Sequence, residues 1–274
     1  MNIWFTEDQT DTVRLGLKVE SVLWKETTAY QELVVANTDA YGRLLVLDGA
    51  VQTTIGDEFV YHEMITHVPL ALHPHPRKVA VIGGGDGGAI REILKHPSVE
   101  EAHLIEIDEK VVEASRRFFP EISAGLDDER AFLHYTDGIQ WVREAKDFDV
   151  IIVDSTDPVG PAEGLFAPEF YASIKEALGD HGIMVAQSES PFLQPHLIQR
   201  VMTGIAQSFP VTRLYLAAVP TYPSGLWSFS LGANGDLQDA ALRPELRDMP
   251  TRYWTPQIQR SCFDLPKFVQ ELVR

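Results

Sequence analysis

The first part of the chain is patterned as short strands joined by tight turns. Between residues 18 and 55, the apolar runs LVV and LLVL are separated from their neighbours by Gly42 and by the pair Asp48-Gly49. Glycines and Asp-Gly pairs between apolar runs are typical of the turns that connect antiparallel strands. We therefore expect a small β-strand domain over residues 1–60.

From about Val60 onward, strand-like runs alternate with helical patterns. The strand candidates are RKVAVIG, AHLIEID, FDVIIVDS and GIMVAQSE, and segments with apolar residues at helical spacing lie between and after them. One of these segments, PEFYASIKEAL, precedes Gly179, which we expect to be its C-cap. Alternating strands and helices are typical of a doubly wound, mostly parallel sheet. We predict an α/β fold with a Rossmann-like domain over residues 61–274.

The stretch VIGGGDGGAIRE joins the first of these strands to its helix. Gly83, Gly85 and Gly88 match the pattern G-x-G-x-x-G between a strand and a helix, the context in which this pattern binds nucleotides. Glu106 ends the next strand, 20 positions after Asp86 (106 − 86). Because an acidic residue there can accept hydrogen bonds from both hydroxyls of a ribose, we predict a nucleoside-containing ligand.

Asp86 lies inside the glycine loop, where a dinucleotide would place its pyrophosphate. A carboxylate at this point would repel a pyrophosphate but would tolerate a cationic sulfonium. The loop therefore favours an S-adenosylmethionine-type ligand over NAD. The formal net charge of −17 agrees with a cationic ligand and argues against nucleic acid as a partner.

Two further acidic stretches follow later strands. HYTDGIQW contains Asp137 and Gly138, and DVIIVDSTDPVGP contains Asp154 and Asp157. Doubly wound sheets bind ligands at the carboxyl ends of their strands, so we expect these residues near the glycine loop. Asp137 can accept a hydrogen bond from an adenine amino group, or it can belong to a plain Asp-Gly turn. Asp154 and Asp157 are either solvated carboxylates of a turn or ligands of an amine, and as amine ligands they would join Asp86 around one cavity.

Composition narrows the class of protein. Contents of 45% hydrophobic and 23% charged residues are ordinary for a globular protein. The single cysteine, Cys262, cannot form an internal disulfide, and the acidic N-terminus has no apolar signal-peptide core. No apolar run approaches the roughly 20 residues that span a bilayer. We expect a cytoplasmic protein with no membrane partner.

Several of these motifs together resemble the spermidine synthases, which are polyamine aminopropyltransferases. The resemblance rests on GGGDGGAIRE, EIDE, TDG, DSTDPVGPAEGLF and PTYPSG, preceded by YQELVV and DEFVYHEM, in order from about Tyr30 to about Gly232. It implies a methyltransferase-like Rossmann domain beside a small N-terminal β-domain, in a homodimer or homotetramer. It also implies aminopropyl transfer from decarboxylated S-adenosylmethionine to putrescine, which gives spermidine and methylthioadenosine. The donor is a co-substrate, and neither a cofactor nor a metal is expected.

The resemblance also implies roles for individual residues. Those expected to contact the donor nucleoside are Gln31, Glu106, Asp137, Gly138 and Pro161. Those expected to hold the polyamine are His62, Asp86, Asp154 and Asp157, of which Asp154 is also the expected catalytic acceptor of the proton. Those expected to line the amine channel are Tyr61, Gln187 and Tyr222. His62 stands where animal members have a glutamine, and bacterial members share this variation.

Three hypotheses are consistent with the sequence. An aminopropyltransferase accounts for the acidic residues, with putrescine, cadaverine, agmatine or spermidine as the acceptor. A small-molecule methyltransferase accounts for the fold and for Glu106, but it leaves Asp86 facing the methionine carboxylate. A non-catalytic nucleoside-binding or polyamine-sensing protein would share the pocket without needing Asp154.

Overall fold

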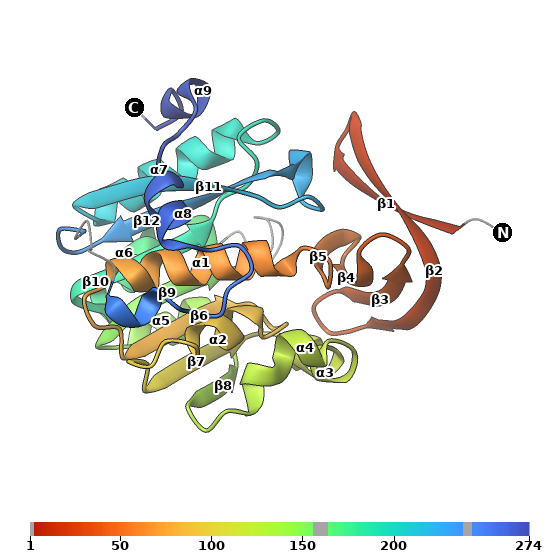
Figure 1. The fold of residues 1–274 in the computed structure, drawn as a ribbon, viewed down its shortest axis with the longest axis horizontal. Coiled ribbons are helices and arrows are strands. Elements are labelled where there is room, and N and C mark those ends of the chain that lie inside the picture. Colours follow the sequence, from red (N-terminus) through yellow and green to blue (C-terminus); the bar gives the residue numbers. More distant parts are fainter. Residues whose placement is uncertain (1–2, 156–163, 238–242, 274) are drawn as a thin grey trace.

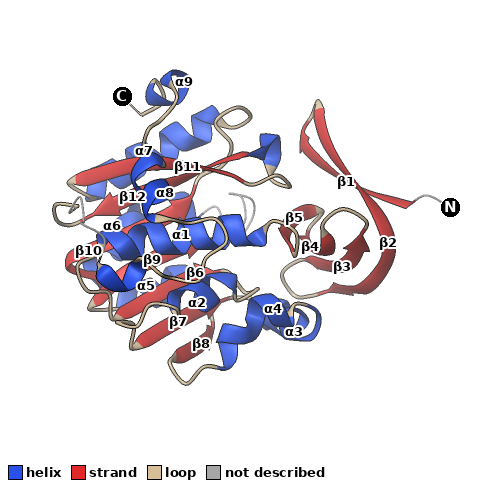
Figure 2. Cartoon of the chain, viewed as in Figure 1, coloured by secondary structure: helices blue, strands red, loops and turns tan. Residues whose placement is uncertain are grey.

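The computed structural model describes residues 3–155, 164–237 and 243–273, and these residues form two sheets (Figures 1 and 2). The N-terminal sheet is antiparallel in the order β1-β2-β3-β4-β5. Its strands are β1 (Ile3–Thr10), β2 (Val13–Thr27), β3 (Glu32–Thr38), β4 (Gly42–Leu47) and β5 (Ala50–Thr54). Gly42 and Gly49 adopt positive φ angles of 72° and 84° beside the turns that the sequence predicts.

The second sheet has the order β8-β7-β6-β9-β10-β12-β11. Its strands are β6 (Lys78–Gly83), β7 (Glu101–Glu106), β8 (Ala131–Tyr135), β9 (Phe148–Asp154), β10 (Leu178–Gln187), β11 (Val211–Ala218) and β12 (Leu226–Ala233). Strands β6 to β10 are parallel, whereas β12 pairs in the antiparallel sense with both β10 and β11. The predicted α/β fold with a mostly parallel sheet is confirmed.

Helices cover both faces of this sheet (Figure 2). The helices are α1 (Glu58–Leu72), α2 (Gly88–Ile93), α3 (Glu109–Phe118), α4 (Pro120–Ser123), α5 (Gly138–Glu144), α6 (Pro168–Ala177), α7 (Pro195–Ser208), α8 (Pro256–Ser261) and α9 (Lys267–Gln270). Side chains alternate along β6, so Val79 and Val81 pack with α1 and α2, while Ala80 and Ile82 pack with α5, α6 and α7. Among the described residues, no helix is long and apolar enough to cross a membrane.

Helix α1 is almost entirely buried and begins close to the N-terminal sheet (Figure 1). Strand β5 ends at Thr54 and α1 begins at Glu58, so the expected domain boundary at residue 60 falls within the first turn of α1. The helix packs in the core of the larger sheet, where Met64, Ile65 and Val68 are fully buried. Its first turn therefore lies where the two sheets meet.

The end of α6 differs from the prediction. The chain turns from helix to strand at Leu178, which has extended φ and ψ angles of −86° and 144°. Leu178 pairs with Phe148 of β9, and Gly179 lies within β10. Gly179 is therefore not the C-cap, because strand pairing begins one residue earlier than the glycine.

Candidate active site

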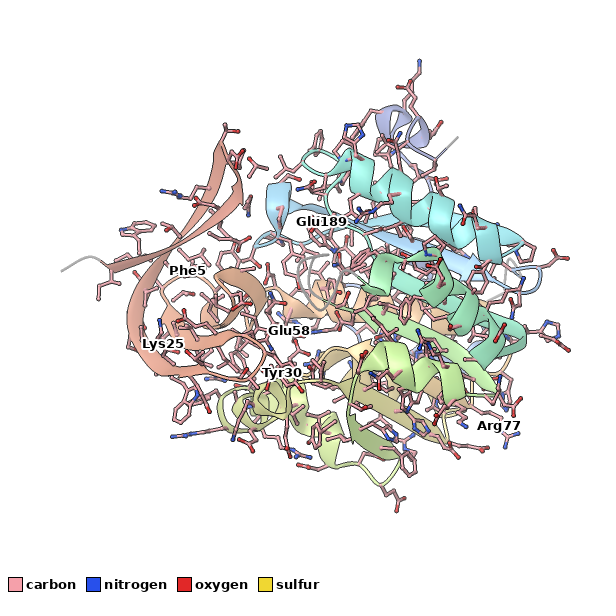
Figure 3. The ribbon with its side chains drawn as sticks, turned by 180° about the vertical axis from the view of Figure 1, so that it is seen from behind. Phe5, Lys25, Tyr30, Glu58, Arg77 and Glu189 are labelled. Atoms are coloured by element: carbon pink, nitrogen blue, oxygen red, sulfur yellow. The ribbon has the colours of Figure 1, made fainter. Side chains whose placement is uncertain are left out.

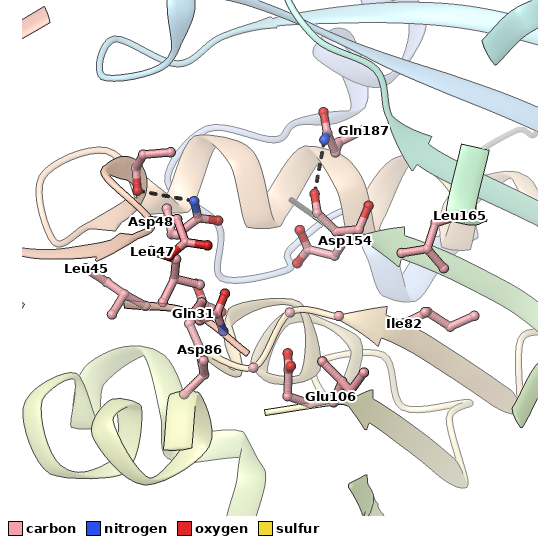
Figure 4. Close-up of a pocket in the computed structure, with 18 of the residues that line it drawn as sticks. Gln31, Leu45, Leu47, Asp48, Ile82, Asp86, Glu106, Asp154, Leu165 and Gln187 are labelled. Carbon is pink, nitrogen blue, oxygen red and sulfur yellow. Dashed lines mark hydrogen bonds between the residues drawn. The ribbon is translucent and has the colours of Figure 1, made fainter. Parts of the chain in front are cut away.

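A cavity of about 360 Å³ is lined by residues of the N-terminal sheet and by residues at the carboxyl ends of β6, β7 and β9. The predicted residues that line it are Gln31, Tyr61, His62, Asp86, Glu106, Asp137, Gly138, Asp154, Gln187 and Tyr222. Asp86, Glu106 and Asp154 come from three segments around the same space (Figure 4). Asp157 and Pro161, the other two predicted site residues, lie outside the described residues.

The glycine loop between β6 and α2 lies against the Glu106 and Asp154 side chains. The Gly84 N–H donates to the Asp154 carbonyl oxygen at 2.9 Å, which ties the loop to the end of β9. A Cβ atom on Gly85 would lie only 2.8 Å from Oε2 of Glu106. Glycine is needed here because the Glu106 carboxylate lies against the loop backbone.

Glu106 is nearly buried at the end of β7, with 8% of its surface exposed. Its Oε1 accepts a hydrogen bond from the Asp108 N–H at 2.9 Å. Burial, together with the Asp108 charge, raises the pKa of Glu106 to about 7 against the opposing effect of backbone N–H groups. The carboxylate is thus held by the backbone, at the edge of the sheet where a ribose is expected.

Asp108 links the N-terminal sheet to this part of the site. Its Oδ2 accepts hydrogen bonds from Thr28 Oγ1 at 2.7 Å and from Gln31 Nε2 at 3.0 Å. Its Oδ1 accepts from the Lys110 N–H at 3.1 Å as the N-cap of α3. The sequence reasoning missed Asp108, although an Asp directly before a helical pattern is an N-cap signal.

Asp137 is a helix N-cap that also faces the cavity, and its contact with adenine stays a prediction. Its Oδ1 accepts the Ile139 N–H at 2.8 Å, so Asp137 is the N-cap of α5. It also lines the cavity together with Gly138. A Cβ on Gly138 would lie 2.4 Å from Cγ2 of Ile82, so a side chain there would force α5 away from β6.

Asp154 ends β9, which lies on the other side of β6 from β7 and Glu106. Tyr61 Oη donates a hydrogen bond to Asp154 Oδ1 at 2.5 Å. Burial, together with the neighbouring Asp86 carboxylate, raises the pKa of Asp154 to about 6 against the opposing effects of His62 and Tyr61. Burial and Asp154 also raise the pKa of Tyr61 well above its ordinary value, so Tyr61 keeps its proton as a donor.

Asp86 is held between a backbone N–H and an imidazole. Its Oδ1 accepts from the Gly88 N–H at 2.8 Å, and its Oδ2 lies 3.2 Å from His62 Nε2. His62 Nδ1 lies 2.6 Å from Oε2 of Glu58. Burial opposes a charge on His62, but Asp86 and Glu58 outweigh it and raise the His62 pKa well above its ordinary value. A Cβ on Gly88 would lie 2.3 Å from the His62 ring, so only glycine leaves room for this contact.

Gln187 and Tyr222 complete the wall of the cavity. Gln187 Nε2 donates to the Ser155 carbonyl oxygen at 3.0 Å, as Figure 4 shows, and Tyr222 Oη donates to the Gln52 carbonyl oxygen at 2.6 Å. The Tyr222 and Tyr61 rings lie 5.3 Å apart between centroids. The labelled apolar residues of the wall are Leu45, Leu47, Ile82 and Leu165.

The acidic residues fall into two groups within one cavity, which we call the nucleoside side and the amine side after the ligands expected there. Glu106 and Asp137 can accept hydrogen bonds from ribose hydroxyls and an amino group, while Asp86 and Asp154 can pair with ammonium groups. A carboxylate with a pKa near 6 is also better matched to accept a proton at neutral pH than an ordinary aspartate. Within the described ranges, no group of three or more His, Cys, Asp or Glu residues could hold a metal ion.

Known protein families match both parts of this chain. Residues 58–239 match the family model described as the spermine/spermidine synthase domain. Residues 3–54 match the model described as the spermidine synthase tetramerisation domain.

Relatives match over the full length. The polyamine aminopropyltransferase of Caldicellulosiruptor bescii is 54% identical over 275 residues, which cover 100% of this chain and 99% of the relative. The enzyme of the same name from Desulforudis audaxviator is 51% identical over 276 residues, with full coverage (100%) of both chains.

Solved structures agree with the sequence matches. A crystal structure of spermidine synthase in complex with the transition-state analogue AdoDATO gives a TM-score of 0.95 at 40% identity, covering 99% of this chain and 94% of that chain. Spermidine synthase from Thermotoga maritima gives a TM-score of 0.92 at 39% identity with the same coverage, 99% and 94%. The resemblance found in the sequence is thereby confirmed. The chain belongs to the spermine/spermidine synthase family of enzymes.

Proposed function

We propose that this protein transfers an aminopropyl group from decarboxylated S-adenosylmethionine to putrescine, giving spermidine and methylthioadenosine. The observation that carries the proposal is the division of one cavity into a nucleoside side and an amine side. Glu106 ends one strand on the first side, and Asp86 and Asp154 lie on the second. The names of the related enzymes support the reaction class.

The proposed donor matches the charge of the amine side. Decarboxylation leaves the donor with an ammonium tail and no carboxylate, so Asp86 would pair with the tail. Intact S-adenosylmethionine would bring its carboxylate toward Asp86, and repulsion would weaken its binding. Glu106 would accept both ribose hydroxyls, and Asp137, Gly138 and Gln31 would surround the rest of the nucleoside.

The proposed chemistry is a displacement at the carbon beside the sulfonium. The acceptor nitrogen forms a bond to this carbon as the carbon–sulfur bond breaks. The electron pair of the broken bond stays on sulfur, which becomes a neutral thioether. Because the sulfonium is already an activated leaving group, we propose that neither a metal nor a cofactor takes part.

The acceptor must lose a proton before its nitrogen can attack, because an alkyl ammonium has a pKa near ~10.4. Asp154, with its pKa raised to about 6, is the proposed acceptor of that proton. The Tyr61 hydroxyl fixes one carboxylate oxygen and leaves the other to aim the amine. Asp154 would therefore both orient and deprotonate the acceptor.

The family match of the N-terminal sheet supports an oligomer. We propose a homotetramer, with a homodimer as the alternative. Light scattering coupled to size-exclusion chromatography distinguishes the two masses, and a monomer at working concentration would contradict both.

The test of the proposed reaction is a donor and acceptor panel analysed by mass spectrometry. The protein is incubated with decarboxylated or intact S-adenosylmethionine and with putrescine, cadaverine, agmatine or spermidine. We expect spermidine and methylthioadenosine from the decarboxylated donor with putrescine. Faster transfer to another amine would change the assigned acceptor, and methylated amine from the intact donor would support a methyltransferase.

Two outcomes bear on the remaining alternatives. Nucleoside binding without product from any pair would favour a binding or sensing protein.

In calorimetry, the intact donor should bind more weakly than the decarboxylated donor, and Asp86→Asn should narrow this difference. Equal binding of both donors to the wild-type protein would contradict the role of Asp86.

A further inference from the structure

A row of alternating charges runs from the protein surface to the amine side of the cavity. Its members are Arg91, Glu58, His62 and Asp86, of which Arg91 is the most exposed, with 18% of its side chain accessible. Glu58 and His62 lie one helical turn apart on α1, whereas Arg91 belongs to α2 and Asp86 to the glycine loop. Figure 3 shows Glu58 near the junction of the two sheets.

Arg91 fixes both oxygens of Glu58. Arg91 Nη2 donates to Oε2 at 2.8 Å, and Nη1 donates to Oε1 at 3.1 Å. Arg91 Nη1 also donates to the Glu121 carbonyl oxygen at 3.0 Å, which ties the guanidinium to α4. Held in this way, the Glu58 carboxylate can only accept from the imidazole of His62.

His62 has a carboxylate at each ring nitrogen, with Glu58 at Nδ1 and Asp86 at Nε2. Carboxylates that accept from both nitrogens require a proton on each, and hence a positive imidazolium. The charged or titratable groups that face His62 come from several elements: Glu58 and Tyr61 on α1, Asp86 on the loop, Asp154 at the end of β9, and Arg91 on α2 through Glu58. Of these groups, the carboxylates of Glu58 and Asp86 are the ones that contact the ring nitrogens of His62.

We propose that Glu58, fixed by Arg91, is a positioning residue that keeps His62 protonated on both ring nitrogens, so that His62 fixes Asp86 and offsets one negative charge beside the amine. The proposal rests on the proposed function of the cavity. A neutral imidazole carries a single N–H, so it could donate to only one of Glu58 and Asp86 and would turn a nitrogen lone pair toward the other carboxylate.

A fixed positive charge beside the cavity has a chemical consequence for the acceptor. A nearby cation disfavours the protonated form of an amine and favours the free amine that must attack. The same charge also lowers the pKa of Asp154, so its benefit lies in favouring the free amine and not in making Asp154 a stronger base. His62 thus influences the acceptor amine in two ways, by fixing Asp86 and by the positive charge of its own imidazolium.

Helix α2, which carries Arg91, also provides a matched control for Glu58. Glu92 also binds Arg91, with Arg91 Nε donating to Oε1 at 2.8 Å, and Glu92 Oε2 lies 3.0 Å from Nε2 of His67. Glu92 is therefore a second buried carboxylate between Arg91 and a histidine of α1. His67 and Glu92 do not line the cavity. Glu92→Gln removes the same charge from the same arginine without touching the amine side.

The first test needs no variant. Nitrogen-15 spectra of the imidazoles report protonation at both ring nitrogens across a pH titration, and His62→Asn identifies the His62 signals among the nine histidines. In the ligand-free wild-type protein, we expect His62 to remain an imidazolium well above its ordinary pKa, because two carboxylates face its ring nitrogens. Titration of wild-type His62 near its ordinary value of about 6.5 would overturn the proposal.

The second test compares Glu58→Gln with Glu92→Gln. Loss of one carboxylate should lower the His62 pKa in Glu58→Gln and leave it unchanged in Glu92→Gln. At saturating donor, kcat of Glu58→Gln relative to wild type should fall about ten- to a hundred-fold as the pH rises through that lowered pKa. The KM for the amine should not rise in parallel, because Asp86 and Asp154 remain in place.

The outcomes separate positioning from structural support. A loss of kcat that is equal at all pH values, or equal in both variants, would assign Glu58 a structural role only. An unchanged His62 titration in Glu58→Gln would also overturn the proposal. If wild-type protein transfers no aminopropyl group, the proposed function fails, while the imidazole titration still decides whether Glu58 controls His62.

Discussion

The nucleoside side and the amine side of the cavity hold their carboxylates differently. On the nucleoside side, Glu106 and Asp137 accept hydrogen bonds from backbone N–H groups at the starts of the following segments. On the amine side, Asp154 is held by the Tyr61 hydroxyl, and Asp86 is shared between a backbone N–H and the His62 ring. Backbone donors do not titrate, whereas the imidazole does. The geometry of the first side therefore follows from the fold, and the charge of the second depends on side-chain partners.

This difference predicts that the two sides can be damaged separately. The largest expected effect is on the amine side, where Asp154→Asn should lower kcat by about 10²–10⁴-fold because positioned proton transfer is lost. Methylthioadenosine affinity should change little, since Glu106 and Asp137 are untouched. Single-turnover transfer at several pH values, beside calorimetry of both proteins, measures the two effects.

The pH series separates the two roles of Asp154. Partial rescue at high pH would assign the loss to deprotonation, because free amine is then supplied from solution. A defect independent of pH would leave Asp154 only the orienting role. Turnover close to that of the wild type would remove it from the mechanism.

Glu106→Gln should have the opposite effect, weakening nucleoside binding more than catalysis. The glutamine oxygen can still accept the Asp108 N–H, but the charged acceptor for the ribose is lost. Methylthioadenosine binding should weaken by about 1.5–3 kcal/mol, while kcat at saturating donor should fall far less than in Asp154→Asn. Unchanged affinity in calorimetry would mean that the ribose lies elsewhere.

The substitutions that impair catalysis or binding should stabilise the ligand-free protein. The folded-state pKa values of Asp154 and Glu106 are raised to about 6 and about 7, so their contribution to stability is present below the unfolded values and lost as pH rises through the folded values. Near pH ~8, Asp154→Asn and Glu106→Gln should therefore raise the free energy of unfolding by about 1–3 kcal/mol.

Glu92→Gln is the matched contrast in denaturant titrations at this pH. The pKa of Glu92 is lowered because His67, Arg91 and Lys95 outweigh the effect of burial. Its stabilising contribution is present above the unfolded pKa, so its removal should destabilise the protein. Destabilisation by all three variants would contradict the raised pKa values on the two sides of the cavity.

The smallest expected effect is the pH dependence of nucleoside binding. In the free protein the pKa of Glu106 is about 7, and a carboxylate that accepts two ribose hydroxyls must be ionised. Methylthioadenosine affinity should therefore fall about tenfold per unit as the pH drops below 7, and should level off above it. Calorimetry across pH measures this slope, and Glu106→Gln should flatten it.

Local sequence patterns were sufficient to predict much of the site. Apolar runs mark the strands, and parallel strands present their carboxyl ends at one edge, so Glu106, Asp137 and Asp154 could be expected near the glycine loop. The predicted helix PEFYASIKEAL extends one residue past the observed end of α6 at Ala177, because pairing between Leu178 and Phe148 depends on a distant strand. Asp108 was missed, although its N-cap position was visible.

What the sequence determined by itself is therefore the order of the elements and the edge of the sheet at which acidic residues gather, since both follow from local periodicity and chain direction. Only the tertiary structure decided the state of those acids. Burial raises the pKa of Asp154 to about 6, and Tyr61 reaches it from a position 93 residues away in the chain. Glu58 and His62 are one helical turn apart in the sequence, but their charges depend on Arg91 and Asp86, which folding brings to either side. Desolvation and Coulomb interactions act through space, so a linear pattern of residues does not contain them.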